Sequence, residues 1–224
     1  MRKGVQIMIA TFENLVIDTS RLTLRPLVED DVTGLYAIFS HPEVMRYWSY
    51  PALTDIAQAQ SMLARIQANY RDGNSVRLGI VRRIDAALLG TCALFSFHEA
   101  SRRAEIGYAL GRPYWGSGYM HEALTALIDY GFGALNLHRI EADIDPRNTG
   151  SARTLERLGF QKEGHLRERW IVDGEISDTA WYGLLRWEWK KHAVLSAQDA
   201  PASRQTAGGG GHAGDPANTA ERCE

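Results

Sequence analysis

The fold is decided by the stretch Glu105-Ile106-Gly107-Tyr108-Ala109-Leu110, which runs into Arg112-Pro113-Tyr114-Trp115-Gly116-Ser117-Gly118-Tyr119. The pattern predicts a strand, then a tight turn with two glycines, then a helix that begins near Tyr119. Glycines in such a turn let backbone N–H groups point into one concavity. A helix that begins there adds its unpaired first-turn N–H groups and the positive end of its dipole. The sequence therefore predicts a site for a phosphate or a pyrophosphate.

Two common phosphate-binding motifs have a different pattern. A P-loop NTPase carries Lys and then Ser or Thr after its second glycine, whereas Tyr119 and Met120 follow Gly118 here. A Rossmann dinucleotide motif has a third glycine where this chain has His121. Nucleotide hydrolysis and NAD binding are therefore disfavoured. A Gly-x-Gly turn that binds nothing remains an alternative at this point.

A second strand-turn-helix unit follows about thirty residues downstream. Residues 138–144 alternate between polar and apolar side chains, as a half-buried strand does. In the next turn Asn148 is a good helix N-cap, and Gly159 supplies a left-handed C-terminal cap. The inward face of the helix between them is marked by Ala152, Leu155 and Leu158.

These segments, taken in order, resemble the GNAT N-acetyltransferase superfamily. The resemblance rests on the strand at 105–110, the Trp115–Tyr119 turn followed by His121-Glu122-Ala123-Leu124, and the run Asn148-Thr149-Gly150-Ser151-Ala152-Arg153-Thr154-Leu155-Glu156-Arg157-Leu158-Gly159-Phe160. The RimJ/RimL-like branch, which acetylates protein N-termini, is indicated by four further segments: Arg21-Leu22-Thr23-Leu24-Arg25-Pro26, Glu163–Arg167, the turn Asp173-Gly174, and Asp178–Leu185. The resemblance covers residues 15 to 192. One position departs from the wider family, because Pro113 stands where many members carry Gln or Arg.

The resemblance implies acetyl-CoA as the acetyl donor, with its pyrophosphate on the amides of the Trp115–Tyr119 turn. It also implies a sheet that splays open between the strand ending at Leu110 and the strand beginning near Arg139, where the pantetheine arm pairs with exposed backbone. The donor-binding residues expected on this basis are Tyr108, Ala109, Leu110, Trp115, Gly116, Ser117, Gly118, Tyr119 and Asn148.

Two residues are candidates for the catalytic chemistry. Glu105 shares one face of its strand with residues 107 and 109, and we expect it to act as the base on the acceptor amine. Its alternative role is a salt bridge with Arg102 or Arg103. Ser151 matches the branch position that donates a proton or a hydrogen bond to the departing thiolate, and its alternative role is a first-turn capping residue. A covalent acyl-enzyme is not expected, because Cys92 has no cationic neighbours in the sequence.

The acceptor implied by the branch is a protein N-terminal amine. The aromatic residues Tyr47, Trp48 and Tyr50 either wall the acceptor cleft or clamp the first two helices. A small amine, such as a polyamine or an antibiotic, is a rival acceptor that calls for a more acidic cleft. A rival of another class is a non-catalytic acyl-CoA-binding sensor, which the presence of both Glu105 and Ser151 argues against.

Composition sets further bounds on the 224-residue chain. We expect a flexible segment at 1–14, one acetyltransferase domain at 15–192, and a disordered Gly-rich tail at 193–224. A formal net charge of −2 favours neither nucleic acid nor an anionic membrane as a partner. The two cysteines, Cys92 and Cys223, do not suggest a disulfide, and a cytoplasmic protein without a metal site is expected. Monomer and homodimer remain open.

The expected architecture is an α/β (α+β) domain around one mixed, largely antiparallel sheet flanked by helices. Helices are predicted at 29–39, 55–70, about 119–135 and after Asn148. Strands are predicted at 21–26, 76–82, 87–97, 104–110, 138–144, 161–170 and 176–185.

Overall fold

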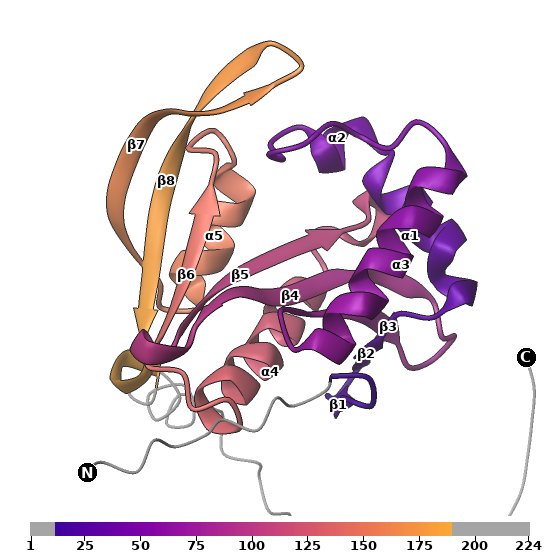
Figure 1. The fold of residues 1–224 in the computed structure, drawn as a ribbon, viewed down its shortest axis with the longest axis horizontal. Coiled ribbons are helices and arrows are strands. Elements are labelled where there is room, and N and C mark those ends of the chain that lie inside the picture. Colours follow the sequence, from indigo (N-terminus) through magenta and orange to yellow (C-terminus); the bar gives the residue numbers. More distant parts are fainter. Residues whose placement is uncertain (1–11, 190–224) are drawn as a thin grey trace, which may run out of the picture.

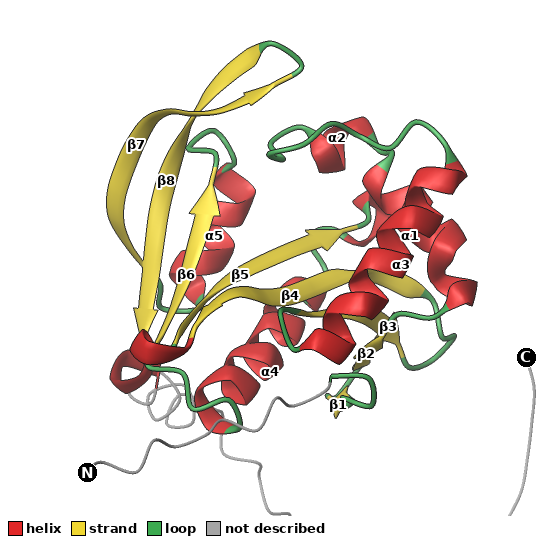
Figure 2. Cartoon of the chain, in the orientation of Figure 1, coloured by secondary structure: helices red, strands yellow, loops and turns green. Residues whose placement is uncertain are grey.

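Eight strands form one sheet in the order β1-β2-β3-β4-β5-β6-β8-β7 across residues 12–189, the part of the chain that the computed structural model describes (Figures 1 and 2). The strands are β1 Ile17–Asp18, β2 Leu22–Pro26, β3 Val76–Arg82, β4 Leu88–His98, β5 Arg103–Leu110, β6 Arg139–Ile144, β7 Gln161–Val172 and β8 Glu175–Leu185. The helices are α1 Val32–Phe39, α2 Pro42–Met45, α3 Ile56–Asp72, α4 Tyr119–Gly133 and α5 Thr149–Arg157. The predictions made for residues 1–11 and 190–224 lie outside the described residues.

The sheet is mixed and mostly antiparallel, as predicted. Within the described residues β5 and β6 pair in parallel, and every other neighbouring pair is antiparallel. The parallel pair arises because α4 lies between these strands in the chain and returns it to the same end of the sheet. The turn and the helix N-terminus that precede α4 are thereby placed at the C-terminal end of β5.

Local signals define the ends of the helices well. Asp55 caps α3 by accepting a 3.0 Å hydrogen bond from the amide of Gln58, and Gly73 ends the helix with a φ of 67°. Asn148 caps α5, and Gly159 has the left-handed conformation with a φ of 86°. The caps at Asn148 and Gly159 confirm those expected from the sequence, and α3 begins where it was predicted and ends two residues later than expected.

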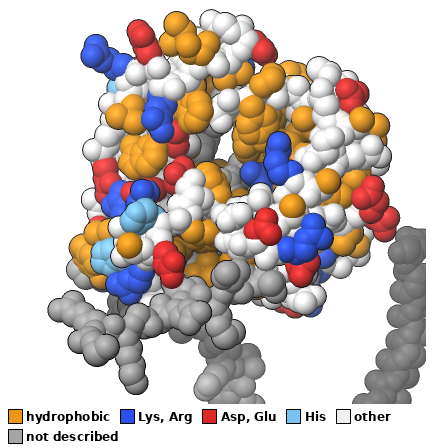
Figure 3. Space-filling model, in the orientation of Figure 1, with side chains coloured by type: hydrophobic (Ala, Val, Ile, Leu, Met, Phe, Trp, Pro, Cys, Tyr) orange, Lys and Arg blue, Asp and Glu red, His pale blue; other side chains and the backbone are white. Residues whose placement is uncertain are grey.

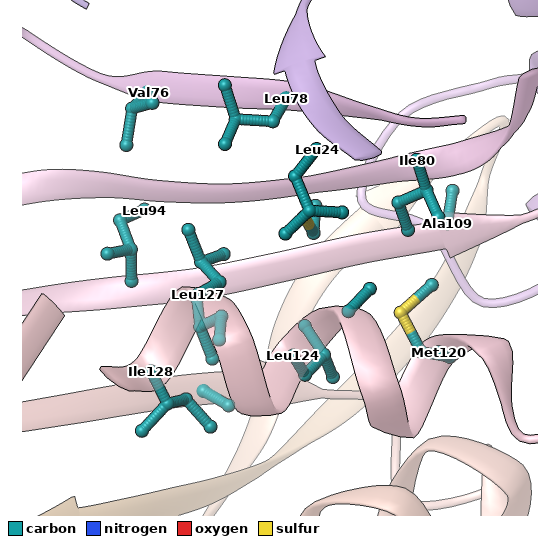
Figure 4. Packing of buried hydrophobic residues seen from close by; sticks show 14 of the residues in the cluster. Leu24, Val76, Leu78, Ile80, Leu94, Ala109, Met120, Leu124, Leu127 and Ile128 are labelled. Atoms are coloured by element: carbon teal, nitrogen blue, oxygen red, sulfur yellow. The ribbon is translucent and has the colours of Figure 1, made fainter. Parts of the chain in front are cut away.

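Helices cover both faces of the sheet. On one face α4 packs its buried side chains, including Leu124, Leu127 and Ile128, against β2, β3 and β4 (Figure 4). On the other face α1 and α3 pack together over β3 and β4 (Figure 1). Burial of this many large apolar side chains supplies the main stabilisation of the domain, at about 1.5–3 kcal/mol each.

Two features near the N-terminus differ from the sequence expectation. Phe12 is buried and its amide donates to the carbonyl of Tyr70 at 3.0 Å, so ordered packing begins before residue 15. Residues 41–50, where the sequence predicts no helix, contain the short helix α2, in which Pro42 occupies the first turn and His41 Nδ1 accepts from the amide of Glu43 at 3.2 Å. A helix of one turn is too short to produce a periodic pattern of apolar residues.

Candidate active site

The central feature of the site is a gap between β5 and β6. The two strands pair only from Arg103 with Arg139 to Glu105 with Glu141, and beyond these residues they diverge (Figure 1). The second half of β5 therefore has β4 on one side and no strand partner on the other.

The register of β4 and β5 determines which backbone groups face this gap. Gly111 donates its amide to Leu89 at 2.8 Å, and the antiparallel ladder alternates from there, so Ala109 is paired with Thr91. The backbone groups of Tyr108 and Leu110 consequently point into the gap. Ala109 was expected with them, but its backbone is turned toward β4 and its side chain is buried.

The glycine turn continues directly from this edge. Gly116 and Gly118 have φ values of 75° and 76°, a conformation that suits glycine, and Gly118 is the N-cap of α4. The indole of Trp115 donates to the carbonyl of Leu110 at 2.7 Å, which ties the turn to the end of β5. The amides of the turn and the unpaired N–H groups of the first turn of α4 are thus assembled beside the gap.

Ser151 lies at the other wall of the gap, on the first turn of α5. Its amide donates to Asn148 Oδ1 at 3.0 Å, and its Oγ lies 2.7 Å from the phenol oxygen of Tyr108. Burial strongly raises the pKa of Tyr108, so the phenol keeps its proton at neutral pH. The side chain of Tyr108 therefore links β5 to α5 across the gap, a contact that the sequence analysis did not foresee.

Glu105 lies where β5 and β6 part. Burial raises the pKa of its carboxyl, a hydrogen bond with Ser96 lowers it, and the carboxylates of Asp143 and Glu141 raise it further. The alternative expected from the sequence, a salt bridge with Arg102 or Arg103, is absent from residues 12–189, and the Arg103 guanidinium donates to Glu141 at 2.8 Å instead. Glu105 remains half-buried on the edge of the gap.

The three aromatic residues expected at the acceptor side are divided between two environments. Trp48 packs edge-on against Phe39 of α1 and against Tyr50, with ring centroids 5.5 and 5.2 Å apart. Tyr50 also lines a cavity of about 760 Å³ that extends to Asp173 in the β7–β8 turn. Trp48 thus packs between α1 and Tyr50, and Tyr50 also lines an open space.

Tyr47 belongs to a cluster of charged residues that the sequence analysis missed. We call Arg46, Tyr47, Asp145, Arg147 and Glu175 the Glu175 cluster. Glu175 binds Arg46 at 3.1 Å and Arg147 at 2.7 Å, and both guanidinium groups lie over the ring of Tyr47. Asp145 binds Arg147 at 2.6 Å. The cluster joins three segments that are distant in sequence: the end of α2, the β6–α5 loop and the start of β8.

Two open spaces lie beside the residues of the candidate site. A hollow separates the β7–β8 side of the molecule from the side formed by α1 to α3 (Figure 3). A second, shallow cavity of about 770 Å³ begins at Arg21 and Gly118 and extends along α4 to Arg157 of α5. Among residues 12–189 no group of His, Cys, Asp or Glu side chains is arranged to hold a metal ion. No helix in this part of the chain is long and apolar enough to cross a membrane.

Comparison with known proteins gives a consistent picture. Residues 21–161 match the acetyltransferase (GNAT) domain family. The chain is 41% identical over 171 residues to the uncharacterized N-acetyltransferase p20 of Bacillus licheniformis, which corresponds to 76% of this chain and 96% of that protein. It is 31% identical over 131 residues to the [ribosomal protein uS5]-alanine N-acetyltransferase of Escherichia coli, with 58% of this chain and 68% of that protein covered.

A solved structure agrees with this likeness. The structure of Mycobacterium smegmatis RimJ in complex with CoA-disulfide matches with a TM-score of 0.71 and 25% identity, over 82% of this chain and 95% of that chain. GNAT acetyltransferases use acetyl-CoA. By its sequence and by its fold, this chain is an N-acetyltransferase that belongs to the GNAT family and resembles its RimJ/RimL-like members.

Proposed function

We propose that the protein transfers the acetyl group of acetyl-CoA to the α-amine of a protein N-terminus, by direct attack in a ternary complex. The observation that carries this proposal is the unpaired edge of β5, which runs from Glu105 to the glycine turn. A thioester on a long polar arm matches such an edge, because the arm's amides can pair with backbone while its phosphates meet the turn.

The donor is bound in this proposal along the whole second half of β5. Tyr108 and Leu110 offer backbone groups to the pantetheine arm, and the amides from Trp115 to Tyr119 bind the pyrophosphate. The cavity along α4 has the room for the nucleotide end. Asn148 holds the N-terminus of α5 against the arm, and a backbone N–H near Tyr108 polarises the thioester carbonyl as an oxyanion hole does.

Glu105 is the proposed base. A protein α-amine titrates near ~8, so its neutral form costs about 1.4 kcal/mol at pH 7, whereas a lysine near ~10.4 costs about 4.6 kcal/mol. A carboxylate with a raised pKa, acting directly or through water, suffices for the first and is a poor base for the second. This difference supports an α-amine as the acceptor.

Ser151 completes the reaction. The amine nitrogen forms a bond to the carbonyl carbon, the carbon–sulfur bond breaks, and the sulfur leaves as a thiolate that needs a proton or a hydrogen bond. The Ser151 hydroxyl supplies it, and the phenol oxygen of Tyr108, 2.7 Å from Ser151 Oγ, holds that hydroxyl in place. The proton lost by the amine passes to Glu105 and then to solvent.

The acceptor assignment draws on one relative and one feature of the site. The Escherichia coli relative is named as a [ribosomal protein uS5]-alanine N-acetyltransferase. The acceptor side of this chain presents Tyr50 and paired charges of the Glu175 cluster rather than an excess of carboxylates, which disfavours a polycationic amine.

The test is acetyl-CoA consumption, measured as free thiol release, with Ala- and Ser-initiated peptides, the same peptides with blocked N-termini, spermidine and an aminoglycoside. We expect turnover with the free peptides and none with the blocked ones. Turnover with spermidine or the aminoglycoside alone would replace the proposed acceptor by a small amine. CoA binding without turnover on any of these amines would favour an acyl-CoA sensor.

A further inference from the structure

The glycine turn is held from outside by the segment before β2. On the first turn of α4, Glu122 accepts four hydrogen bonds from three consecutive residues. They come from Thr19 Oγ1 at 2.6 Å, Ser20 Oγ at 2.9 Å, the Arg21 amide at 2.8 Å and Arg21 Nε at 2.6 Å. A segment about one hundred residues away in sequence is thereby fixed to the start of α4.

The guanidinium of Arg21 extends from Glu122 across the turn. Its Nη1 donates to the carbonyl of Ser117 at 3.0 Å, and its Cζ lies 4.6 Å from the ring centroid of Tyr119. Its Nη2 is 3.5 Å from the place that a methyl group on Gly118 would occupy. One side chain thus contacts Ser117 and Tyr119 and lies beside Gly118 between them.

These contacts determine where a turn amide points. In a trans peptide the C=O and N–H groups point in opposite directions, so the bond to the Ser117 carbonyl also fixes the Gly118 N–H. The turn needs such support because Gly116 and Gly118 bring no side chains and leave the backbone free to adopt many conformations. Pro113, which precedes them, has no side-chain donor with which to provide it.

The carboxylate of Glu122 is the anchor of this arrangement. Burial acts to raise its pKa, but the hydrogen bonds from Thr19, Arg21 and Ser20 outweigh burial and lower it to about 2. Glu122 is therefore ionised at neutral pH. Arg21 compensates its charge, which would otherwise repel a phosphate at the N-terminus of α4.

We propose that Arg21, held by Glu122, is a positioning residue of the donor site and orients the Ser117–Gly118 peptide so that the turn amides converge on a pyrophosphate. This inference rests on the proposed function, in which the turn binds acetyl-CoA. It assigns a role to a residue that lies far from the glycine turn in sequence.

The experiment compares two acetyl donors in the Arg21→Met variant. Acetyl-CoA carries the pyrophosphate, whereas acetyl-pantetheine ends before it. We expect the KM for acetyl-CoA and the Kd of CoA to rise about tenfold, as the loss of a charge-assisted hydrogen bond predicts, with kcat nearly unchanged. The kcat/KM for acetyl-pantetheine should equal that of the wild type. Arg71→Met, at an exposed position on the last turn of α3, is the matched control and should leave both donors unaffected.

Two results would overturn the inference. An unchanged Kd of CoA would show that Arg21 does not support the turn, and an equal loss with both donors would show that it serves the fold alone. Should Arg21→Met fail to fold, Arg21→Lys provides the same comparison. One ammonium group can pair with Glu122, but it cannot at the same time donate to the Ser117 carbonyl as the forked guanidinium does. Wild-type protein that binds no CoA would instead refute the proposed function.

Discussion

The surroundings of Glu105 shift its pKa in the direction expected for the base that we propose. Burial is the largest influence on its pKa and raises it, and the neighbouring carboxylates of Asp143 and Glu141 act in the same direction. Arg103, which could have lowered it more strongly, is engaged by Glu141. A base is most effective when its pKa approaches the working pH, so the raised pKa supports the role of base that we propose for Glu105.

The first prediction concerns this carboxylate. Glu105→Gln should lower kcat about a hundredfold, as expected for the loss of a general base, while the Kd of CoA stays the same. In the wild type the rate should rise with pH through the raised pKa of Glu105, since only the ionised form accepts a proton. The pH–rate profile of the variant should lack the rise due to Glu105 and keep the rise due to the acceptor amine.

Steady-state kinetics over pH and calorimetry with CoA measure these quantities, with the exposed Glu99→Gln as the control. Normal turnover combined with weakened CoA binding would contradict the role of base.

The sequence predicts residues with local roles better than residues whose roles depend on tertiary packing. Asn148 was expected as an N-cap because capping involves only the next three residues, and its bond to Ser151 confirms this. The bond between Tyr108 and Ser151 joins residues 43 positions apart, and it depends on how α5 lies against β5. The contact between Arg21 and Glu122 was not predicted, for the same reason.

At the scale of elements, the strands, the four longer helices and the sheet type follow from apolar periodicity, caps and turn residues. Asp55 and Gly73 delimit α3, and Asp173-Gly174 closes the β7–β8 hairpin, as expected. Periodicity did not reveal α2, which is a single turn begun by Pro42. The exact register that turns Tyr108 and Leu110 toward the gap, and Ala109 away from it, depends on tertiary pairing and could not be derived from residue types.

The second prediction uses two glycines with the same backbone conformation. Gly118 in the glycine turn has a φ of 76° and Gly174 in the β7–β8 turn a φ of 82°. An alanine at either place brings strain of about 1–2 kcal/mol. We expect Gly118→Ala to weaken CoA binding about tenfold or more, and Gly174→Ala to lose similar stability with CoA binding intact.

Thermal unfolding and CoA titration of both variants separate the two effects. If the two variants bind CoA equally well, the conformation of Gly118 has no part in forming the donor site.

Over the whole molecule, one partly buried carboxylate, that of Glu122, ties the N-terminal segment to α4. The pKa of Glu122 is about 2 in the folded protein and lies below its ordinary value of 4.5. A lowered pKa means that the stabilisation is present above pH 4.5 and is lost as the pH falls toward 2. The full effect is about 3 kcal/mol, since one pKa unit corresponds to about 1.4 kcal/mol.

The third prediction follows from the lowered pKa of Glu122. Glu122→Gln should lower the free energy of unfolding at pH 7, and the difference from the wild type should shrink steadily as the pH falls from about 4.5. Urea unfolding at a series of pH values provides the measurement. A difference that is independent of pH would mean that the carboxylate charge is not the source of the stabilisation.

The fourth prediction concerns the Glu175 cluster, which joins three segments around the acceptor side. Glu175→Gln should change the KM for the peptide acceptor about two- to threefold, because exposed ion pairs contribute little individually. The KM for acetyl-CoA should not change. High salt should produce a similar change in the wild type and have less effect on the variant.

The control for this prediction is Asp85→Asn, which removes the exposed Arg82–Asp85 pair in the β3–β4 turn. A parallel change in the donor KM would indicate that the cluster supports α5 and the donor site rather than the acceptor side.

Family membership and general chemistry could be expected from motifs that lie within single segments. The proposed acceptor side could not, because it is assembled from α2, the loop after β6 and the β7–β8 hairpin, which no single motif brings together. The same holds for the Glu175 cluster, in which Arg46 and Glu175 are 129 positions apart.

The early parting of β5 and β6 also has a consequence for solvent exchange. The amide hydrogens of Tyr108 and Leu110 face an unfilled position in the sheet, so without donor they should exchange with deuterium far faster than those of Ala109 and Gly107, which bond to β4. Added CoA should slow the first pair and leave the second unchanged. The amide exchange rates of alternate residues in this one strand would then report whether CoA is bound.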